Sequence, residues 1–283
     1  MKTIALILLL LNLATLVEAQ VINGIVFDSA TQAPLPYVHV GVRDKNLGTI
    51  SRDDGTFRID LTKAAFTDSL TFSSVGYRTQ HIAQPEKTQD YLKVFLATQT
   101  YTLREVLIEN ERIYEPVKLG RHQPTKITTG HSGPGDFGFG GEWGVRIANQ
   151  DQTYRIVDIA FHTRFNTLDS VLFRINIYSI QDDLPHESLL QHELLVKSYR
   201  RDKWITKDVS DKRIIIDQDI IVTFEVLQLW RSARGNNALF FTHDTNPQQS
   251  KTYRRLSSLA PWEIQEDPPL TLYLRVLGYK YSN

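Results

Sequence analysis

The sequence predicts an all-β protein made of two successive β-sandwiches behind an N-terminal export signal. Three observations support this fold class. Short β-prone runs alternate with turn clusters along the chain, and 12 Tyr and 13 Phe enrich it in residues that favour strands. No sustained 3.6-residue apolar period follows residue 19. The 283 residues include no cysteine, so we expect both sandwiches to be stabilised by core burial alone, without disulfides or a thiol nucleophile.

Residues 1–19 have the pattern of a cleavable signal peptide. Lys2 precedes an apolar run from Ile4 to Val17, and Val17 and Ala19 are small residues at the positions that a signal peptidase reads. The run is shorter than the roughly 20 residues of a membrane-spanning helix, and no cysteine follows it for lipid attachment. We therefore expect a mature chain that starts at Gln20, has no membrane span, and lies in the periplasm, at the outer membrane or on the cell surface.

The balance of charge bears on the partners. Lys plus Arg total 32 and Asp plus Glu total 32, so the chain has no global field that would steer it to nucleic acid. A GxGxxG match at 133–138 lacks the preceding strand and following helix that a dinucleotide site requires. We expect no nucleic-acid partner and no cofactor, and the oligomeric state stays open.

The first part of the mature chain predicts strands separated by tight turns. In the run 37–43, Tyr37, His39 and Gly41 alternate with valines, which is typical of a half-buried strand with His39 facing outward. Asp54-Gly55 is a strong signal for a hairpin turn, and a calcium loop would need a further acidic ligand that is absent here. The expected strands are 21–28, 37–43, 47–51, 56–61, 69–74, 77–82, 91–96 and 102–108.

Three groups of motif residues and a closing motif carry a family resemblance. They are Gly24, Val26 and Asp28; Pro34 and Leu35; Gly48, Thr49, Ser51, Asp53 or Asp54, Gly55 and Phe57; and Phe72, Ser73, Val75, Gly76 and Tyr77. On these residues, the segment 20–108 resembles the carboxypeptidase regulatory-like domain. The resemblance implies a transthyretin-like sandwich of seven strands with no catalysis of its own, of a kind common in exported proteins of Bacteroidota. The following sequence does not resemble a receptor plug or barrel, so a nutrient-receptor function is not carried over.

The rest of the chain divides into a linker with an entry loop at 109–142 and a second domain at 143–283. Scattered charges, prolines and glycines indicate the linker, including the loop around Gly130. The second domain is expected to be a jelly-roll-like antiparallel β-sandwich, with a short helix considered within 184–196, and NTLDSVLFRINIY gives it a faint resemblance to the jelly-roll region of other exported proteins. The expected strands are 143–149, 154–165, 170–180, 193–200, 203–210, 212–216, 220–229, 237–243 and 269–278.

The candidate site residues lie in the second domain. Glu225 interrupts an apolar strand, and alternation puts it with Thr223 and Leu227 on a face that we interpret as solvated or ligand-facing. Trp and Tyr that stack on sugar rings, beside Arg that binds hydroxyls, would suit a glycan, although the aromatic residues could instead close the end of the sandwich. The ligand-binding candidates are Trp230, Tyr253, Arg254, Trp262 and Glu225.

The spacing of histidines and carboxylates predicts neither a metal site nor a catalytic pair. His186 and His192 are six residues apart, so HESLLQHE is not the zinc motif H-E-x-x-H. The leading hypothesis is a non-catalytic binding or scaffold protein of the cell envelope, with a glycan or an envelope protein as partner. Two alternatives remain: an accessory hydrolase with a site in the C-terminal loops, and a structural subunit of an envelope assembly.

Overall fold

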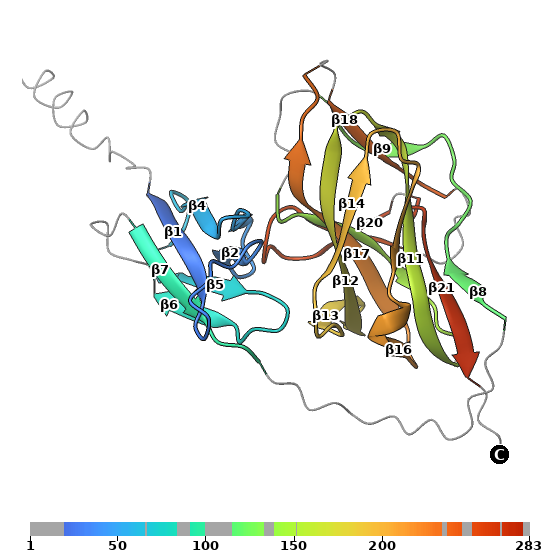
Figure 1. Ribbon diagram of the computed structural model, residues 1–283, viewed down its shortest axis with the longest axis horizontal. Coiled ribbons are helices and arrows are strands. Elements are labelled where there is room, and N and C mark those ends of the chain that lie inside the picture. The colour runs from blue at the N-terminus through green and yellow to red at the C-terminus, as the bar shows by residue number, and fades with distance from the viewer. Residues whose placement is uncertain are drawn as a thin grey trace, which may run out of the picture.

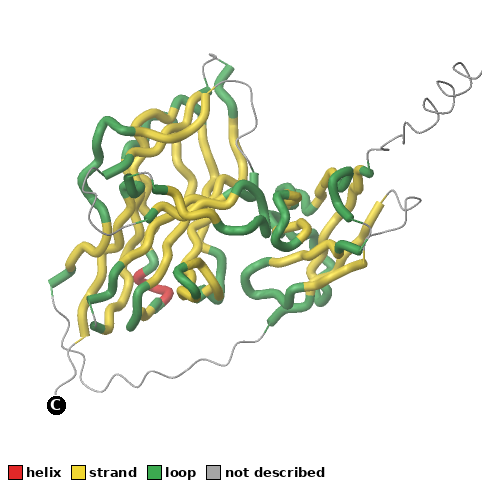
Figure 2. Tube along the Cα trace, turned by 180° about the vertical axis from the view of Figure 1, so that it is seen from behind, coloured by secondary structure: helices red, strands yellow, loops and turns green. Residues whose placement is uncertain are grey.

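The computed structural model describes residues 20–65, 67–83, 91–99, 115–132, 139–150, 152–233, 237–244, 251–266 and 268–279. Strands and loops make up nearly all of this part of the chain, with one short 3-10 helix, η1 (Ser210–Lys212), seen as the single red turn in Figure 2. The predicted all-β class is confirmed. The expected signal peptide and the expected strand at 102–108 lie outside the described residues. Those residues include no helix with the length and hydropathy of a membrane crossing.

The described residues of the N-terminal unit form seven strands in two sheets. The first sheet has the strand order β4-β1-β7, in which β1 is antiparallel to β4 and parallel to β7. The second sheet has the order β3-β2-β5-β6. Alternate residues of β1 are buried, and they pack with those of the other sheet around Val26, Val40 and Phe72. The strands are β1 (Val21–Asp28), β2 (His39–Val42), β3 (Leu47–Ile50), β4 (Thr56–Asp60), β5 (Ser69–Ser73), β6 (Gln80–Ala83) and β7 (Tyr91–Leu96).

The acidic turn at residues 53–55 is structural, as predicted, but it does not close a hairpin. Asp54 Oδ1 accepts hydrogen bonds from the amide of Thr56 at 2.9 Å and from its hydroxyl at 2.6 Å. Gly55 has φ +78°, which favours glycine. The flanking strands β3 and β4 belong to different sheets, so the turn carries the chain from one sheet to the other. Alternating residues on either side of Asp54-Gly55 predict a turn whether the two flanking strands pair with each other or lie in different sheets. Only the pairing partners, β2 for β3 and β1 for β4, distinguish the two arrangements.

The C-terminal unit has two larger sheets. The first has the order β13-β12-β17-β10-β19-β20 with β14 beside β12, and the second has β8-β21-β11-β18-β9 with β15 and β16 beside β11. Phenylalanines of both sheets, among them Phe161, Phe224 and Phe241, stack in the core between them. The strands are β8 (Val117–Gly120), β9 (Thr128–Ser132), β10 (Glu142–Ile147), β11 (Thr153–Asn166), β12 (Ser170–Gln181), β13 (Leu184–Ser188), β14 (Leu194–Tyr199), β15 (Trp204–Asp208), β16 (Ile215–Ile216), β17 (Ile220–Trp230), β18 (Ala238–Thr242), β19 (Thr252–Arg255), β20 (Glu263–Gln265) and β21 (Leu272–Tyr279).

Two expectations for this unit are corrected. The segment 109–142 is not wholly a linker, because β8 pairs with β21 and β9 with β18, and Leu119 joins the core. The helix considered within 184–196 is absent: β13 and β14 occupy its ends and both pair with β12. In the pairing of β14 with β12, Leu194 lies opposite Ile175. The strand pairing that β12 offers therefore outweighs the helical spacing of the leucines within this segment.

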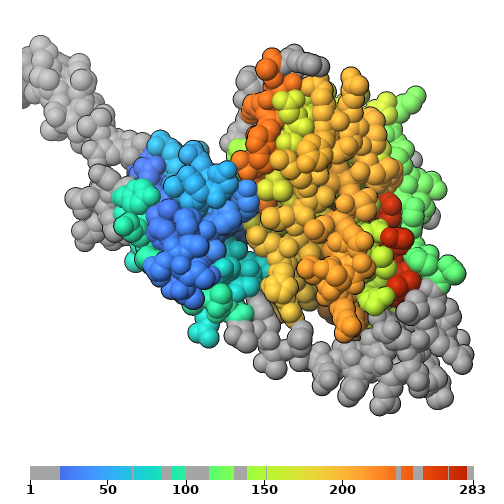
Figure 3. All heavy atoms as spheres, viewed as in Figure 1, coloured from blue at the N-terminus to red at the C-terminus, as the bar shows by residue number. Residues whose placement is uncertain are grey.

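The two units are in direct contact. Figure 1 shows β2 and β5 of the N-terminal unit facing the side of the C-terminal unit that holds β12 and β17, and Figure 3 shows the two surfaces touching. Tyr37, Ile50 and Leu227 form a small apolar cluster across the contact. Around it, the Tyr37 hydroxyl donates to Gln228 at 2.8 Å and the Ser257 hydroxyl donates to Asn46 at 2.9 Å. We call this contact the domain interface.

Gly48 allows a close backbone approach at the domain interface, which gives a first testable prediction. A Cβ at residue 48 would lie 2.1 Å from the carbonyl oxygen of Ser258. We expect Gly48→Ala to push the two units apart and to lower the free energy of unfolding by about 1–3 kcal/mol. Urea denaturation measures the change. Thr49→Ala, at the adjacent position, serves as the control, and an equal loss in both variants would contradict the prediction.

Candidate functional site

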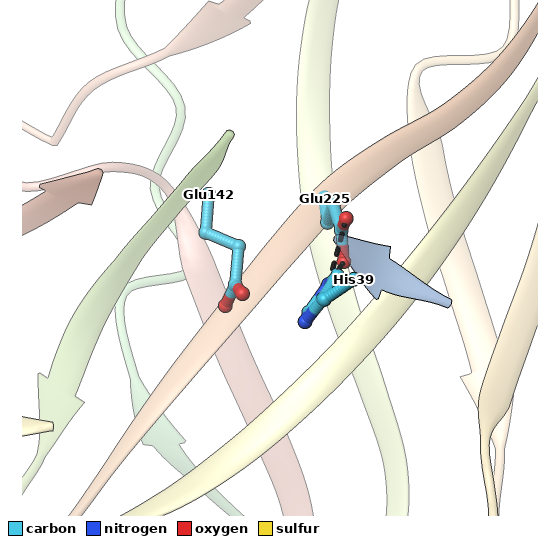
Figure 4. Close-up of side chains that lie close together, drawn as sticks. All are labelled: His39, Glu142 and Glu225. Atoms are coloured by element: carbon cyan, nitrogen blue, oxygen red, sulfur yellow. Dashed lines mark hydrogen bonds and ion pairs between the residues drawn. The ribbon is translucent and has the colours of Figure 1, made fainter. Parts of the chain in front are cut away.

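Five charged or titratable side chains from five strands meet at the domain interface. His39 comes from β2, and Glu142, Arg174, Glu225 and Arg255 come from β10, β12, β17 and β19. We call these five residues the interface cluster. Their exposed fractions range from 0% to 8%, so the cluster is removed from water. Figure 4 shows His39 of the N-terminal unit pointing toward Glu225, with Glu142 beside them.

Strand alternation explains why the cluster forms. On β17, Phe224 and Val226 point into the core between the two large sheets, so Glu225 points to the opposite side. Arg174 lies directly opposite Glu225 in the pairing of β12 with β17, and Glu142 lies opposite Glu225 in the pairing of β10 with β17. Arg255 is the next residue across, opposite Glu142. Across β12, β17, β10 and β19 the row therefore holds two adjacent glutamates with an arginine on either side.

His39 joins the two units through Glu225. Its Nε2 lies 3.0 Å from both carboxylate oxygens of Glu225 and 2.9 Å from Arg174 Nη1. Arg174 Nη1 also donates to Glu225 Oε2 at 3.2 Å, and Arg174 Nη2 donates to the carbonyl of Tyr37. A further ion pair joins Arg174 Nη2 to Glu193 at 2.9 Å. The guanidinium of Arg174 therefore reaches across the interface and contacts the backbone of the N-terminal unit.

Glu142 is satisfied within the C-terminal unit. It accepts a charge-assisted hydrogen bond from Arg255, one from the Thr223 hydroxyl at 2.5 Å and one from the Tyr178 hydroxyl at 3.1 Å. The indole of Trp262 lies over Arg255, with 4.8 Å from the guanidinium carbon to the ring centroid. Glu142 is thus held on both oxygens by buried donors, and Trp262 covers its positive partner.

The charges in the cluster compensate one another, as the pKa directions indicate. Burial opposes ionisation of Glu225, but His39 and Arg174 outweigh it and lower its pKa to about 2. Burial likewise disfavours a charged Arg255, whereas Glu142 raises the pKa of its guanidinium above the usual value. Burial and then the charge of Glu142 raise the pKa of the Tyr178 hydroxyl, which stays a donor. Glu225 is therefore a carboxylate in the folded protein.

The same residues have the composition of a small metal site but not its electrostatics. His39, Glu142 and Glu225 each offer a ligand atom, and the three atoms lie within 4.8 Å of one another. Arg174 and Arg255 already bind the two carboxylates. A divalent cation placed there would face two buried guanidinium groups, so the arrangement fits an ion-pair network better than a metal centre.

The depressed pKa of Glu225 predicts a dependence of stability on pH. A carboxyl with an ordinary pKa of 4.5 when unfolded and about 2 when folded contributes stability that is complete above pH 4.5. That contribution is lost as the pH falls through the folded value of about 2. We expect Glu225→Gln to flatten the pH dependence of the unfolding free energy between these two values. Urea titrations of both proteins across this range measure it, and parallel curves would contradict the assignment.

The structure separates the five sequence-predicted site residues. Glu225 is in the interface cluster, and the expectation of a solvated or ligand-facing surface is wrong for it, because the N-terminal unit covers that face. Tyr253 is fully buried, with its hydroxyl 3.5 Å from Asp183. Trp230 is at the opposite end of β12 from Trp262: it pairs with Ser170, whereas Trp262 contacts Tyr178.

Eight residues of extended strand separate those two contact points, a span of roughly 25 Å. Arg254 is half-buried and forms an ion pair with Glu263 at 2.8 Å. The structure thus brings Glu225 and Trp262 into one neighbourhood and leaves Trp230 outside it.

Sequence reasoning missed four members of the interface cluster. His39 was interpreted as an outward strand histidine, and Glu142, Arg174 and Arg255 were not among the five candidate site residues. The available signal was Arg174, a cation in the middle of the apolar strand SVLFRINIYSI, because Glu225 in IIVTFEVLQLW has the same outward placement and the opposite charge. Opposite charges on the outward faces of two apolar strands favour direct pairing.

Comparisons with known proteins identify the N-terminal unit. Residues 22–108 match the family model described as the CarboxypepD_reg-like domain, so the N-terminal unit is a CarboxypepD_reg-like domain, as its motifs predicted. This domain covers less than a third of the chain, and the part that follows it has no family assignment. No curated protein matches the chain.

Solved structures add little for the C-terminal unit. A structure of the infectious bursal disease virus Gx strain is 8% identical with a TM-score of 0.26, covering 92% of this chain and 63% of the other. A structure described as manganese lipoxygenase of Gaeumannomyces graminis with partial zonadhesin of Komagataella pastoris is 11% identical with a TM-score of 0.20, covering 92% and 84%. The chain spans less than two thirds of the first of these proteins. Neither likeness supports an argument about function.

Proposed function

We propose that this protein is a non-catalytic, exported binding or scaffold protein of the cell envelope, whose ligand is a glycan or a partner protein. The observation that carries the proposal is the interface cluster. Its histidine and both glutamates have exposed fractions of 8% or less and are bound to arginines or hydroxyls. His39, Glu225 and Arg174 hold the two folded units in one orientation, Glu142 is held within the C-terminal unit, and none of these side chains is accessible to a substrate.

The fold supports the same proposal. A buried network joins the CarboxypepD_reg-like domain to the second unit. Each unit keeps an outer surface away from the domain interface, and such a surface suits binding of a ligand or a partner. We also propose the finer fold assignments: a transthyretin-like sandwich for β1–β7 and a jelly-roll-like sandwich for the C-terminal sheets. A first boundary near residue 108 is part of this proposal, and assigning β8 and β9 to the second domain moves its start from residue 143 to about residue 117.

Export and binding can be tested on the full chain. Expressed with a C-terminal tag in a Gram-negative host, the protein should be recovered from the periplasmic or outer-membrane fraction with residues 1–19 removed, as read by intact mass. Tagged protein should then capture a polysaccharide or a specific envelope protein, and it should release no reducing ends from polysaccharides beyond a heat-denatured control.

Two results would contradict the proposal. An intact N-terminus with recovery from the cytoplasm would remove the export part. Cleavage of a polysaccharide that survives purification, and that is lost in a variant of the C-terminal loops, would replace the binding role with the hydrolase alternative.

A further inference from the structure

An aromatic row crosses the outer face of the second large sheet, away from the domain interface. The His162 ring packs edge-to-face on Trp204 at 4.8 Å, Trp204 packs on Tyr273 at 5.2 Å, and Tyr273 packs on His122 at 6.2 Å. The residues come from β11, the edge strand β15, β21 and the segment after β8. We call these four residues the aromatic row.

The position of the row follows from strand alternation. Ile205 and Phe161 point into the core, so their neighbours Trp204 and His162, which pair across β15 and β11, point outward. Ala160 lies between Thr206 and Tyr273 in the register and is fully buried, although it belongs to the outward set. A small residue at this point lets the two large rings meet above the sheet. Figure 1 places β21 and β8 on the side of the C-terminal unit far from β1–β7.

Basic groups surround the row in excess of acidic ones. Lys118 lies over Tyr273, with its Nζ 4.5 Å from the ring centroid. Lys203 and Arg164 lie on the other side and, after burial, lower the pKa of His162. Arg275 holds Asp158 by a hydrogen bond of 2.6 Å, which leaves Asp208 as the other outward carboxylate of these strands. The four cations and two carboxylates give this face a positive balance in a chain whose total charge is zero.

We infer that the aromatic row is a binding surface for an acidic polysaccharide, one whose sugars carry carboxylates. Trp204 is 37% exposed on an edge strand, so a pyranose can stack on its indole at the border of the sheet. Lys118 and Lys203 are exposed on opposite sides of the rings and can each bind a sugar carboxylate. A neutral sugar would use the rings but give neither ammonium group a carboxylate partner, and Lys203 Nζ would keep only its hydrogen bond to the carbonyl of Arg164 at 2.6 Å. This inference rests on the proposed binding function and names its ligand class.

The test measures binding of the full chain to three probes by affinity electrophoresis. The probes are polygalacturonate, its fully methyl-esterified form, which keeps the rings but not the charge, and poly-glutamate, which keeps the charge but not the rings. We expect tight binding to the first and weaker binding to the other two. Trp204→Ala should weaken binding to polygalacturonate by about thirtyfold, the effect of a central aromatic anchor.

Two further variants make the test specific. Lys118→Glu, an exposed change on β8, should weaken binding to polygalacturonate and not to the methyl ester. Tyr199→Ala is the matched control, because Tyr199 is also an exposed aromatic residue beside a lysine: it is 59% exposed, and Lys197 Nζ lies 5.9 Å from its ring centroid. Tyr199 lies on β14 of the other sheet, so this variant should bind polygalacturonate as tightly as the unaltered chain. Equal affinity of Trp204→Ala and the unaltered chain, or binding to poly-glutamate as tight as to polygalacturonate, would overturn the inference.

The inference and the proposed function fail in distinguishable ways. If no polysaccharide binds while an envelope protein is captured, the acidic glycan is excluded and the binding role stands. If polygalacturonate is cleaved, the increase in reducing ends contradicts the non-catalytic role as well.

Discussion

Arg174→Ala is expected to lower the free energy of unfolding by about 3–5 kcal/mol, because it leaves Glu225 charged, buried and short of a partner. The guanidinium of Arg174 binds Glu225 Oε2 at 3.2 Å, Glu193 at 2.9 Å and the carbonyl of Tyr37. The side chain of Arg174 is only 2% exposed, so water cannot replace these contacts without opening the domain interface. Urea denaturation followed by tryptophan fluorescence measures the loss.

Arg146→Ala provides a control of the same residue type. Arg146 forms ion pairs with Asp183 at 3.1 Å and Asp219 at 2.7 Å, but its side chain is 40% exposed. Exposed pairs contribute about 1 kcal/mol or less, so this variant should change stability little. If the two substitutions cost the same, burial of the interface cluster would not be the source of its energy.

Glu142→Ala is the second change with a large expected effect, again about 3–5 kcal/mol. It removes the acceptor of three donors, namely the buried Arg255, the buried hydroxyl of Thr223 and the hydroxyl of the half-buried Tyr178. Unlike Arg174, Glu142 is contacted only from the C-terminal unit in these bonds, so the loss should appear as destabilisation of that unit itself. Thermal unfolding monitored by near-UV circular dichroism would record it.

Two companion variants separate charge from hydrogen bonding at residue 142. Glu142→Gln keeps one acceptor oxygen and should lose less than Glu142→Ala. Glu142→Leu combined with Arg255→Met removes both charges together and should recover much of the stability, because a buried pair replaced by apolar side chains costs little. No recovery in the double variant would mean that the hydroxyl contacts, and not the ion pair, dominate at this position.

Much of the fold could be predicted from the sequence because strand alternation is a local property. The strands expected at 21–28 and 91–96 have the same bounds in the structure, and Asp54-Gly55 marks a real turn. The short strands β8 and β9 were missed because their residues are rich in glycine and polar side chains, and their pairing depends on β21 and β18 far along the chain. The C-terminal topology could not be deduced for the same reason.

The candidate site was harder to predict, for a different physical reason. Alternation identified the outward side of Glu225 and of His39 correctly, but it says only that a side chain leaves its own core. Whether water or another folded unit meets that face is decided by a contact between residues 186 positions apart. Sequence patterns also did not reveal that Tyr253 is buried, or that Trp204 and Tyr273, which were not selected, meet on an outer face.

The distance along the chain between the halves of the interface cluster has a consequence for the order in which the protein folds. All strands that support His39 are present once β7 has emerged, well before Arg174 and Glu225 exist as part of a sheet. The N-terminal unit can therefore form with His39 hydrated, and the second unit with its own charges hydrated. Closure of the interface is then a late docking step, in which two finished surfaces lose their water together, as when subunits associate.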